Sequence, residues 1–414
     1  MKLPEGWHNK LLGELFTKIV VGYVGNVNDH YCDAAIGVPF YRTLNIRDGY
    51  FRHDDIRYVT PEFNDKNKKS QIENDDILIA RVGANLGMVC KATGLNRTSN
   101  MANAIIIKSK SAKNADPDFY TYFLLSTYGK SQIYAGAAGG AQGVFNTKLT
   151  QEIAVPVPPL AEQKKIAQIL SAWDKAISVT EKLLTNSQQQ KKALMQQLLS
   201  GKKRLLDENG VMFSGEWEVV RLKQLIHEEK KRNRDNHIQR VLSVTNHSGF
   251  VLPEEQFSKR VASEDVSTYK IVKKNQYGYN PSRLNVGSFA RLDNYDEGVL
   301  SPMYVVFSIN HERLNSDYFL NWMSSNEAKQ RIAGSTQGSV RDSVGFDALC
   351  SFSFSLPTLM EQQKIAAVLS AADAEITTLE KKLACLKEEK KALMQQLLTG
   401  KRRVKVEVED TVCA

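Results

Sequence analysis

The sequence has few cysteines and no long apolar segment. Its five cysteines, at positions 32, 90, 350, 385 and 413, are scattered and include no C-x-x-C pair. This spacing argues against a disulfide framework or a zinc site and fits a reducing compartment. No run of apolar residues is long enough to span a membrane, and the N-terminal stretch MKLPEGWHNK lacks the apolar centre of a signal peptide. These absences predict a cytoplasmic protein.

Motifs for the common kinds of catalysis are also missing. The glycine-rich stretch GAAGGAQG (136–143) lacks the lysine of a phosphate-binding loop, and RVGANLG (81–87) departs from the dinucleotide pattern G-x-G-x-x-G. The stretch YNPSR (279–283) lacks the second proline and the aromatic residue of the run that amino-methyltransferases use. The seven histidines show neither H-x-x-x-H nor H-E-x-x-H spacing. We therefore expect no catalysis by this chain alone, no cofactor and no metal site.

Charge is unevenly placed along the chain. Of 414 residues, 55 are basic and 46 acidic, giving a net charge of +9. Segments 159–204 and 358–403 carry net charges of +6 and +3, which equal the whole excess. The rest of the chain is balanced, so any surface there that binds a polyanion must arise by spatial segregation of charge. The length predicts two or three domains.

A long segment occurs twice in the chain. Residues 158–204 match residues 357–403 at 27 of 47 positions, and the final fourteen residues of each copy differ only at one Ser/Thr and one Lys/Arg position. The beginnings of the halves also correspond through a shared W-x4-L-x2-L pattern, formed by Trp7, Leu12 and Leu15 and by Trp217, Leu222 and Leu225. Such a repeat indicates a tandem duplication and takes precedence over local assignments.

Between these anchors the halves differ in sequence but keep the same order of elements. An apolar β-rich run is followed by a helix-like run, a Gly/Ser/Gln-rich loop, a short strand, a proline and the long repeat. These runs are 104–109, 116–127 and 135–143 in the first half and 304–309, 315–332 and 333–339 in the second.

Each copy of the repeat is predicted to form a long helix. Prolines precede it, a glutamate lies in its first turn, and Gly201 or Gly400 follows its end. Apolar residues recur with the 4-3 spacing of a coiled-coil seam. The predicted seam residues are Ile166, Leu170, Trp173, Ile177, Leu184, Leu194 and Leu198, and Ile365, Leu369, Ile376, Leu379, Leu383, Leu386, Leu393 and Leu397.

The two helices are expected to pair with each other. A helix of about 40 residues is about 60 Å long and would overhang a domain built from the rest of one half. Antiparallel pairing of duplicated helices gives pseudo-twofold symmetry. Because Trp173 has Ala372 as its counterpart, the seam packing cannot be strictly symmetric. We predict an α+β fold with two globular domains separated by two long helices that form an antiparallel coiled coil. The alternative is that each helix packs as a core helix of its own domain.

The basic tails GKKR (201–204) and GKRR (400–403) have two interpretations. Cations at the end of a helix complement its dipole and cap free carbonyls, and this structural interpretation is favoured. The alternative is direct contact with phosphates.

Two turns contain residue types that can read DNA bases. The stretch DDILIARVGANLG (75–87) includes Arg81 and Asn85, and KIVKKNQYGYNPSRLNVGS (270–288) includes Arg283 and Asn285 at a comparable place. Arginine pairs with guanine and asparagine with adenine in the major groove, and nearby glycine allows close approach of the backbone to a phosphate. Gln142 and Gln337, in the glycine-rich loops, are a second choice. The alternative for each turn is a β-turn with an exposed arginine.

These residues resemble the specificity (S) subunit of Type I restriction–modification systems, over essentially the whole chain. The most specific parts are the P-L-x-E-Q-x-K-I-A-x-[IV]-L openings that end at Leu170 and Leu369, and the KKALMQQLL[ST]GK endings. The tandem organisation and the stretches ILIARVGANLG and YNPSRLNVGS add to the resemblance.

The resemblance implies a non-catalytic subunit with two target-recognition domains. Each domain would read one half of a split double-stranded DNA target, and the conserved helices would dock two adenine-methyltransferase (M) subunits. Motor-nuclease (R) subunits would complete the complex. The assembly would then be an adenine-specific DNA methyltransferase and, with the motor subunit, an ATP-dependent endonuclease.

On this basis the chain divides into recognition domains and spacers. The expected boundaries are 1–157 (first recognition domain), 158–204 (first helix), 205–356 (second recognition domain), 357–403 (second helix) and 404–414 (tail). Helix length limits the separation of the half-sites to about 17 base pairs. Since the two variable domains differ in sequence, we expect unlike half-sites and an asymmetric target. A coiled-coil assembly scaffold with two binding domains and no role with DNA is the alternative function. The missing motifs count against a third possibility, a self-sufficient DNA-modifying enzyme.

Overall fold

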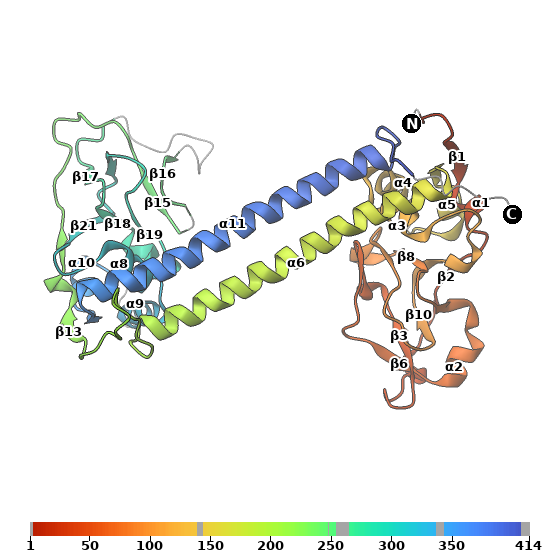
Figure 1. Cartoon of the computed structure of the whole chain (residues 1–414), viewed down its shortest axis with the longest axis horizontal. Coiled ribbons are helices and arrows are strands. Elements are labelled where there is room, and N and C mark those ends of the chain that lie inside the picture. The colour runs from red at the N-terminus through yellow and green to blue at the C-terminus, as the bar shows by residue number, and fades with distance from the viewer. Residues whose placement is uncertain (1–2, 139–143, 247, 254–264, 337–342, 407–414) are drawn as a thin grey trace. The chain divides into compact units, whose positions relative to one another are not determined.

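Two compact units make up the chain in the computed structural model. The model describes residues 3–138, 144–246, 248–253, 265–336 and 343–406. Unit 1 contains residues 1–181 and 381–414, and unit 2 contains residues 182–380. The two long helices, α6 (Leu160–Leu198) and α11 (Leu359–Leu397), therefore contribute one part to each unit (Figure 1). Each helix has 39 residues and lies inside the predicted 47-residue repeat.

Unit 1 contains short strands with small helices between them. Its strands are β1 (His8–Leu11), β2 (Ile19–Val21), β3 (Val38–Tyr41), β4 (Ile46–Arg47), β5 (Tyr50–Phe51), β6 (Arg57–Val59), β7 (Gln71–Ile72), β8 (Ile77–Ala80), β9 (Val89–Lys91), β10 (Ser99–Met101), β11 (Ala104–Ile107) and β12 (Ala154–Val157). Its α-helices, besides its part of α6 and α11, are α1 (Leu12–Leu15), α2 (Pro61–Lys66), α3 (Pro117–Leu125), α4 (Thr127–Ala138) and α5 (Thr147–Gln151). The 3-10 helices are η1 (Asn28–His30), η2 (Thr43–Asn45), η3 (Lys68–Ser70), η4 (Gly83–Asn85) and η5 (Ser109–Ser111).

Unit 2 has fewer described strands but a similar order. Its strands are β13 (Glu218–Arg221), β14 (Ile226–Glu228), β15 (Ser243–Thr245), β16 (Gly249–Val251), β17 (Lys270–Lys273), β18 (Tyr277–Tyr279), β19 (Phe289–Arg291), β20 (Glu297–Leu300), β21 (Val305–Ile309) and β22 (Ser353–Leu356). Its helices, besides its part of α6 and α11, are α8 (Ser316–Met323), α9 (Asn326–Thr336), α10 (Phe346–Cys350), η6 (Leu222–Gln224) and η7 (Pro281–Val286).

The two units share one framework. In unit 1 a four-stranded antiparallel sheet has the order β2-β11-β8-β9, and in unit 2 the order β14-β21-β18-β19 repeats it element for element. The first strand of each half also pairs antiparallel with the strand that precedes its long helix, β1 with β12 and β13 with β22. The remaining sheets differ, since unit 1 has β6-β3-β10-β7 where unit 2 has the pairs β15-β16 and β17-β20. The tandem duplication predicted from the sequence is therefore confirmed.

Two local predictions need correction. The single helix-like run predicted at 315–332 is broken into α8 and α9, because Ser325 starts a new helix and its hydroxyl accepts a hydrogen bond from the Ala328 N–H at 3.2 Å. The predicted loops at 135–143 and 333–339 begin as helix, since α4 continues to Ala138 and α9 to Thr336. In unit 1 the alanines on both sides of Gly136 favour the extension of the helix.

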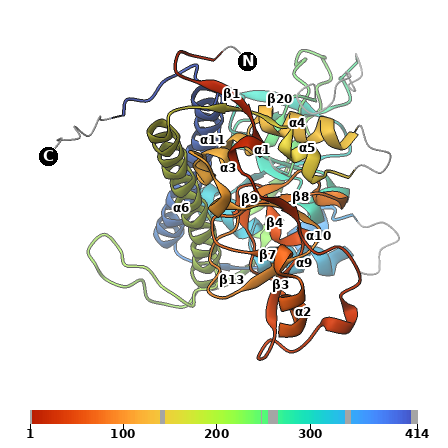
Figure 2. The same ribbon diagram turned by 90° about the vertical axis from the view of Figure 1, so that its right-hand side faces the viewer.

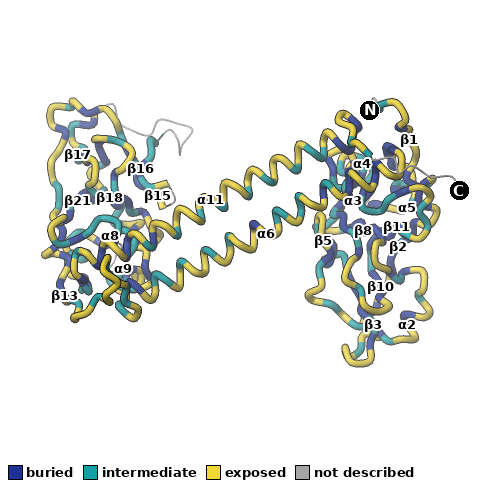
Figure 3. The backbone as a smooth tube through the Cα atoms, in the orientation of Figure 1, coloured by how far each residue is buried: buried dark blue, intermediate teal, exposed yellow. Residues whose placement is uncertain are grey.

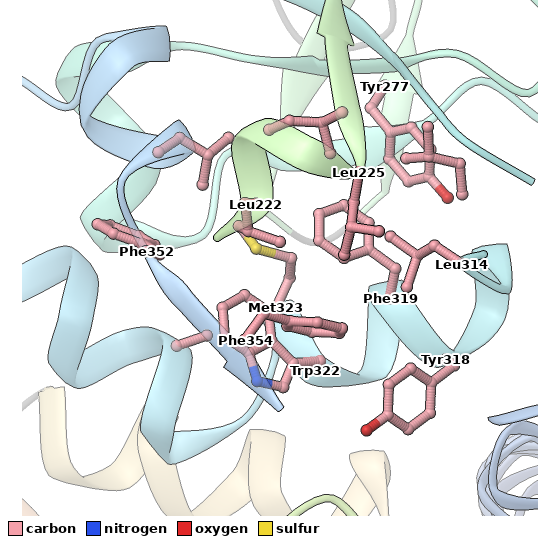
Figure 4. Close-up of a cluster of buried hydrophobic side chains, with 14 of the residues drawn as sticks. Leu222, Leu225, Tyr277, Leu314, Tyr318, Phe319, Trp322, Met323, Phe352 and Phe354 are labelled. Atoms are coloured by element: carbon pink, nitrogen blue, oxygen red, sulfur yellow. The ribbon is translucent and has the colours of Figure 1, made fainter. Parts of the chain in front are cut away.

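The core of unit 2 explains the shared W-x4-L-x2-L pattern. Leu222 and Leu225 are buried against Trp322 and Phe354, whose rings meet edge to face at a centroid distance of 4.7 Å (Figure 4). The equivalent leucines of unit 1 are buried in the same way. In unit 1, α3 lies between α6 and the strands β8 and β9 (Figure 2).

The predicted seam residues fall into two groups. Near the helix ends, Ile166, Leu170 and Leu397 are buried in the core of unit 1, and Leu198, Ile365 and Leu369 in the core of unit 2. Along the middle of the helices the other seam residues are half-buried, as expected where only two helices pack together (Figure 3). The helix ends thus pack in the cores of the globular units while the middle parts pair. The alternative, a core helix confined to its own domain, is wrong, because each helix enters the cores of both units.

Ion pairs join the two antiparallel helices at equivalent places in each unit. In unit 1 the Lys390 ammonium lies 2.5 Å from the Asp174 carboxylate, and in unit 2 Lys191 lies 2.5 Å from Asp373. The repeat offset of 199 residues relates the two pairs, because Asp174 corresponds to Asp373 and Lys390 corresponds to Lys191. The predicted antiparallel coiled coil with pseudo-twofold symmetry is confirmed. Within the described residues, none of the helices combines the length and apolarity that crossing a bilayer requires.

Candidate nucleic-acid interface

The two predicted base-reading turns occupy equivalent places in the fold. Arg81 and Asn85 lie between β8 and β9, while Arg283 and Asn285 lie between β18 and β19. These strands are the third and fourth of the sheet that both units share. The comparable placement inferred from the sequence is therefore correct, although the two turns are built differently.

In unit 1 the turn is tied into the domain. The Asn85 side chain accepts a hydrogen bond from an Arg47 guanidinium nitrogen at 3.0 Å and donates to the Thr43 carbonyl oxygen at 3.4 Å. Arg81 is half-buried, and its Nε is a buried nitrogen without a hydrogen-bond partner in the described structure. The Asn85 amide thus accepts one hydrogen bond and donates one within the domain, so it holds the turn in place.

Gly87 closes this turn and makes a close internal contact. Its φ of +82° lies in the left-handed region, and a Cβ added to it would meet the Tyr134 ring at 2.7 Å. Its carbonyl oxygen accepts a hydrogen bond from Lys130, which also pairs with Asp48. The sequence suggested that glycine here would leave room for a phosphate, but α4 fills that space.

In unit 2 the turn is open to solvent. The Asn280 side chain caps η7 by accepting a hydrogen bond from the Ser282 N–H at 3.0 Å, and Leu284 anchors the turn in the core. Arg283 and Asn285 are both exposed. Neither side chain makes a hydrogen bond or salt bridge within the described residues, so both are available to an external partner.

A neighbouring arginine of unit 2 is not available in this way. Arg291, in β19, binds Asp293 at 2.6 Å and Asp317 at 2.8 Å. Burial disfavours its charged form, but the hydrogen bonds to the two aspartates outweigh burial and raise its pKa. Arg291 is therefore a structural cation, whereas Arg283 has no side-chain partner among the described residues.

Other side chains near the turns were not identified from the sequence. Arg47 contacts Asn85 but lies 38 residues away in the chain, and no local pattern marks it. Asn246 lines a cavity together with Asn285, and again only the fold brings them together. Gln142 and Gln337, the second-choice contacts, lie outside the described residues. Within the described residues, no three His, Cys, Asp or Glu side chains form a group that could hold a metal ion.

A family model matches both halves of the chain. The model, described as Type I restriction modification DNA specificity domain, matches residues 4–186 and 214–388. The Type I restriction enzyme MjaVIII specificity subunit of Methanocaldococcus jannaschii is 24% identical over 430 residues, which cover 98% of this chain and 95% of that protein. The Type I restriction enzyme EcoBI specificity subunit of Escherichia coli is 24% identical over 201 residues, covering 48% of this chain and 41% of that protein.

Solved structures have the same fold. The S subunit of a Type I restriction–modification system from M. genitalium superimposes with a TM-score of 0.55 at 12% identity, covering 96% of this chain and 98% of that one. A chain from a structure described as showing complex assembly and conformational transition of the type I R-M system gives a TM-score of 0.52 at 15% identity, covering 97% of this chain and 100% of that one.

Proposed function

Because this chain belongs to the family of type I restriction–modification DNA specificity proteins, we propose that its two units read the two parts of an asymmetric, bipartite DNA target. The chain is a DNA sequence-recognition subunit without catalysis of its own. The recognition domains would be residues 1–157 and 205–356, the helical spacers residues 158–204 and 357–403, and the tail residues 404–414. The dispersed free cysteines support a role in the cytoplasm.

One observation carries the proposal of an asymmetric target. The two units repeat the same sheet order, yet the turns at the same place in that sheet differ in conformation and exposure. Phosphate contacts position a protein on DNA, while side chains at base edges specify the sequence. A conserved framework with unlike turns supports two unlike half-sites, with Arg283 and Asn285 as the readers in unit 2 and Arg81 and Asn85 at the reading edge in unit 1.

The helices would dock the catalytic partners. Each unit contains its own paired stretch of α6 and α11, held by Asp174–Lys390 in unit 1 and by Lys191–Asp373 in unit 2. Two equivalent stretches support two adenine-methyltransferase subunits in the complex, and motor-nuclease subunits would join that assembly. The complex would then methylate adenine and, with the motor subunit, cleave DNA with ATP.

Co-expression tests this function. The chain is produced with a candidate methyltransferase subunit, and adenine methylation of the host DNA is mapped. We expect a split, asymmetric methylated motif that appears only when this chain is present. An intact complex that leaves no new methylation, or that methylates with the same specificity without this chain, would contradict the proposal and favour an assembly scaffold.

A further inference from the structure

Unit 2 contains a cationic cavity where α6 ends beside the start of α9. Its volume is about 430 Å³, and its floor includes Met195 and Leu199. Four lysines line it: Lys191, Lys192, Lys202 and Lys329. The one acidic side chain in the lining, Glu327, binds Arg331 at 2.7 Å and is therefore neutralised from within the protein.

This cavity continues into a second one that reaches the base-reading turn. The second cavity, of about 460 Å³, is lined by Asn246 and Asn285, and it shares Ser324 and Lys329 with the first. We call the two together the α9 groove. Among the residues that the structure describes, no acidic side chain lines the second cavity. The groove therefore has lysines at one end and two amide side chains at the other.

The repeat identifies the counterparts in unit 1 of two residues of α9. The residue equivalent to Lys329 in unit 1, at the repeat offset of 199, is Lys130, which binds the Gly87 carbonyl oxygen and Asp48. The equivalent of Ala333 is Tyr134, whose ring packs on Gly87. The first unit thus fills this place with its own side chains. In unit 2 the corresponding residue, Ala333, has no ring, and Lys329 makes no salt bridge within the described residues.

Most lysines of the groove are not neutralised by a salt bridge within the described residues. Of the four, Lys191 pairs with Asp373, while Lys192, Lys202 and Lys329 make no salt bridge within the described part of the chain. The basic tail of α6 therefore has two roles, because Arg204 binds Glu361 whereas Lys202 lines the groove. The N-terminus of α9 is already capped by Ser325, so the lysines rather than the helix end supply the attraction for an anion.

From these contacts we propose that the α9 groove binds the phosphate backbone of the half-site that unit 2 reads, with Asn285 and Asn246 placed toward the base edges. The inference rests on the proposed DNA-recognition function and deepens it. Lysine and hydroxyl side chains are among the groups that contact DNA phosphates, and asparagine is a reader of adenine. The arrangement places backbone binding and base reading along one continuous surface.

The test uses the full chain and a labelled DNA duplex of mixed sequence, with affinity measured as a function of salt. Each phosphate contact contributes about 0.9 to the slope of log affinity against log salt. We therefore expect Lys192→Gln, Lys202→Gln and Lys329→Gln together to reduce that slope by about 2 to 3. A charge-matched control with Lys364→Gln, Lys381→Gln and Lys382→Gln, three exposed lysines of α11, should leave the slope near that of the wild type.

A second variant tests the groove without changing charge. Ala333→Tyr introduces the side chain that fills the equivalent place in unit 1, and we expect it to weaken binding several-fold with an unchanged melting temperature. If wild-type protein binds the duplex but the triple-lysine variant has the control's slope, the groove proposal is wrong and the proposed function stands. If the triple variant instead loses co-purification with the methyltransferase while its slope is unchanged, the groove binds protein and the proposal is equally overturned. A wild-type chain that binds no duplex at low salt would contradict the proposed function itself.

Discussion

Arg204, just beyond the end of the first long helix, forms a two-pronged salt bridge with Glu361 in the first turn of the second. Its Nε lies 2.6 Å from Oε1 and its second guanidinium nitrogen 2.8 Å from Oε2, and Trp217 donates to the same carboxylate at 3.0 Å. The duplication generates a second such cluster in unit 1, where Arg403 and Trp7 bind Glu162. Each helix end is thereby joined to the start of the other helix.

Removing the buried carboxylate should destabilise unit 2. The Glu361 side chain is 1% exposed and Arg204 is 20% exposed. Glu361→Ala leaves a partly buried guanidinium and an indole N–H without their acceptor, so we expect a loss of about 3 to 5 kcal/mol in the free energy of unfolding. Denaturant unfolding, followed by tryptophan fluorescence, measures it.

Two variants make this measurement specific. Glu312→Ala removes an exposed carboxylate elsewhere in unit 2 and should leave stability nearly unchanged. Glu162→Ala breaks the equivalent cluster of unit 1, where the arginine is more exposed, and should cost less than Glu361→Ala. Equal losses for Glu361→Ala and Glu312→Ala would show that the cluster does not stabilise the fold.

The ion pairs between the long helices predict a charge-swap result. Lys191→Asp places a second carboxylate beside Asp373, with Glu375 nearby, and should lower the melting temperature. The double variant Lys191→Asp with Asp373→Lys restores opposite charges and should recover most of the loss. Because both side chains are partly exposed, the coupling energy is expected to be only about 0.2 to 1 kcal/mol. If the double variant loses as much stability as the two single variants together, this ion pair does not determine the helix register.

A buried glutamine at the start of each long helix gives a third prediction. Gln163 is fully buried; its side chain accepts from the Asp116 N–H at 2.8 Å and donates to the carbonyl oxygens of Asn114 and Pro158 at 3.1 and 2.9 Å. Gln163→Leu leaves three backbone groups unsatisfied, so we expect a loss of about 3 kcal/mol or more in stability. Gln168→Leu, at an exposed position of the same helix, is the control. Similar stabilities of the two variants would contradict the assigned role.

The sequence predicted the framework well because repetition and spacing are local properties. The 4-3 spacing located the seam from Ile166 to Leu198, and comparison of the two halves located the turns that hold Arg81 and Arg283. The first-turn glutamates and the terminal arginines are identical in the two copies, but each of these residues pairs with a residue of the other copy. The spacing of residues within one copy of the repeat cannot reveal a contact between the two copies.

The sequence did not show whether the side chains of the candidate site are already hydrogen-bonded within the protein. Asn85 and Asn285 look alike in sequence, yet Asn85 is bound by Arg47, whereas the Asn285 side chain makes no hydrogen bond within the described residues. Whether a polar side chain is satisfied depends on residues that folding brings near, and Arg47 comes from a different strand. The α9 groove likewise depends on the fold, because Asn246, Asn285 and Lys329 are distant in the chain and line the same cavity.

Exchanging a recognition domain predicts how independent the two units are. Replacing residues 205–356 by the corresponding segment of another family member should change one part of the methylated motif and leave the other unchanged, because each unit has its own core. Methylation mapping of the exchanged protein, co-expressed with the methyltransferase, provides the measurement. A change in both parts would mean that the units do not read DNA independently.

The two asparagines of the reading turns should respond differently to removal. Asn285→Ala deletes an exposed, unbound amide, so we expect an unchanged melting temperature but relaxed preference at one position of the unit 2 half-site, by about 1 to 3 kcal/mol of discrimination. Asn85→Ala breaks the hydrogen bonds to Arg47 and Thr43 and should cost about 1 to 2 kcal/mol of stability in unit 1. Thermal unfolding and binding to single-base variants of the mapped target, measured on the same protein samples, separate the two effects. If Asn285→Ala lowers stability without altering base preference, the turn of unit 2 is structural and its role in reading DNA is refuted.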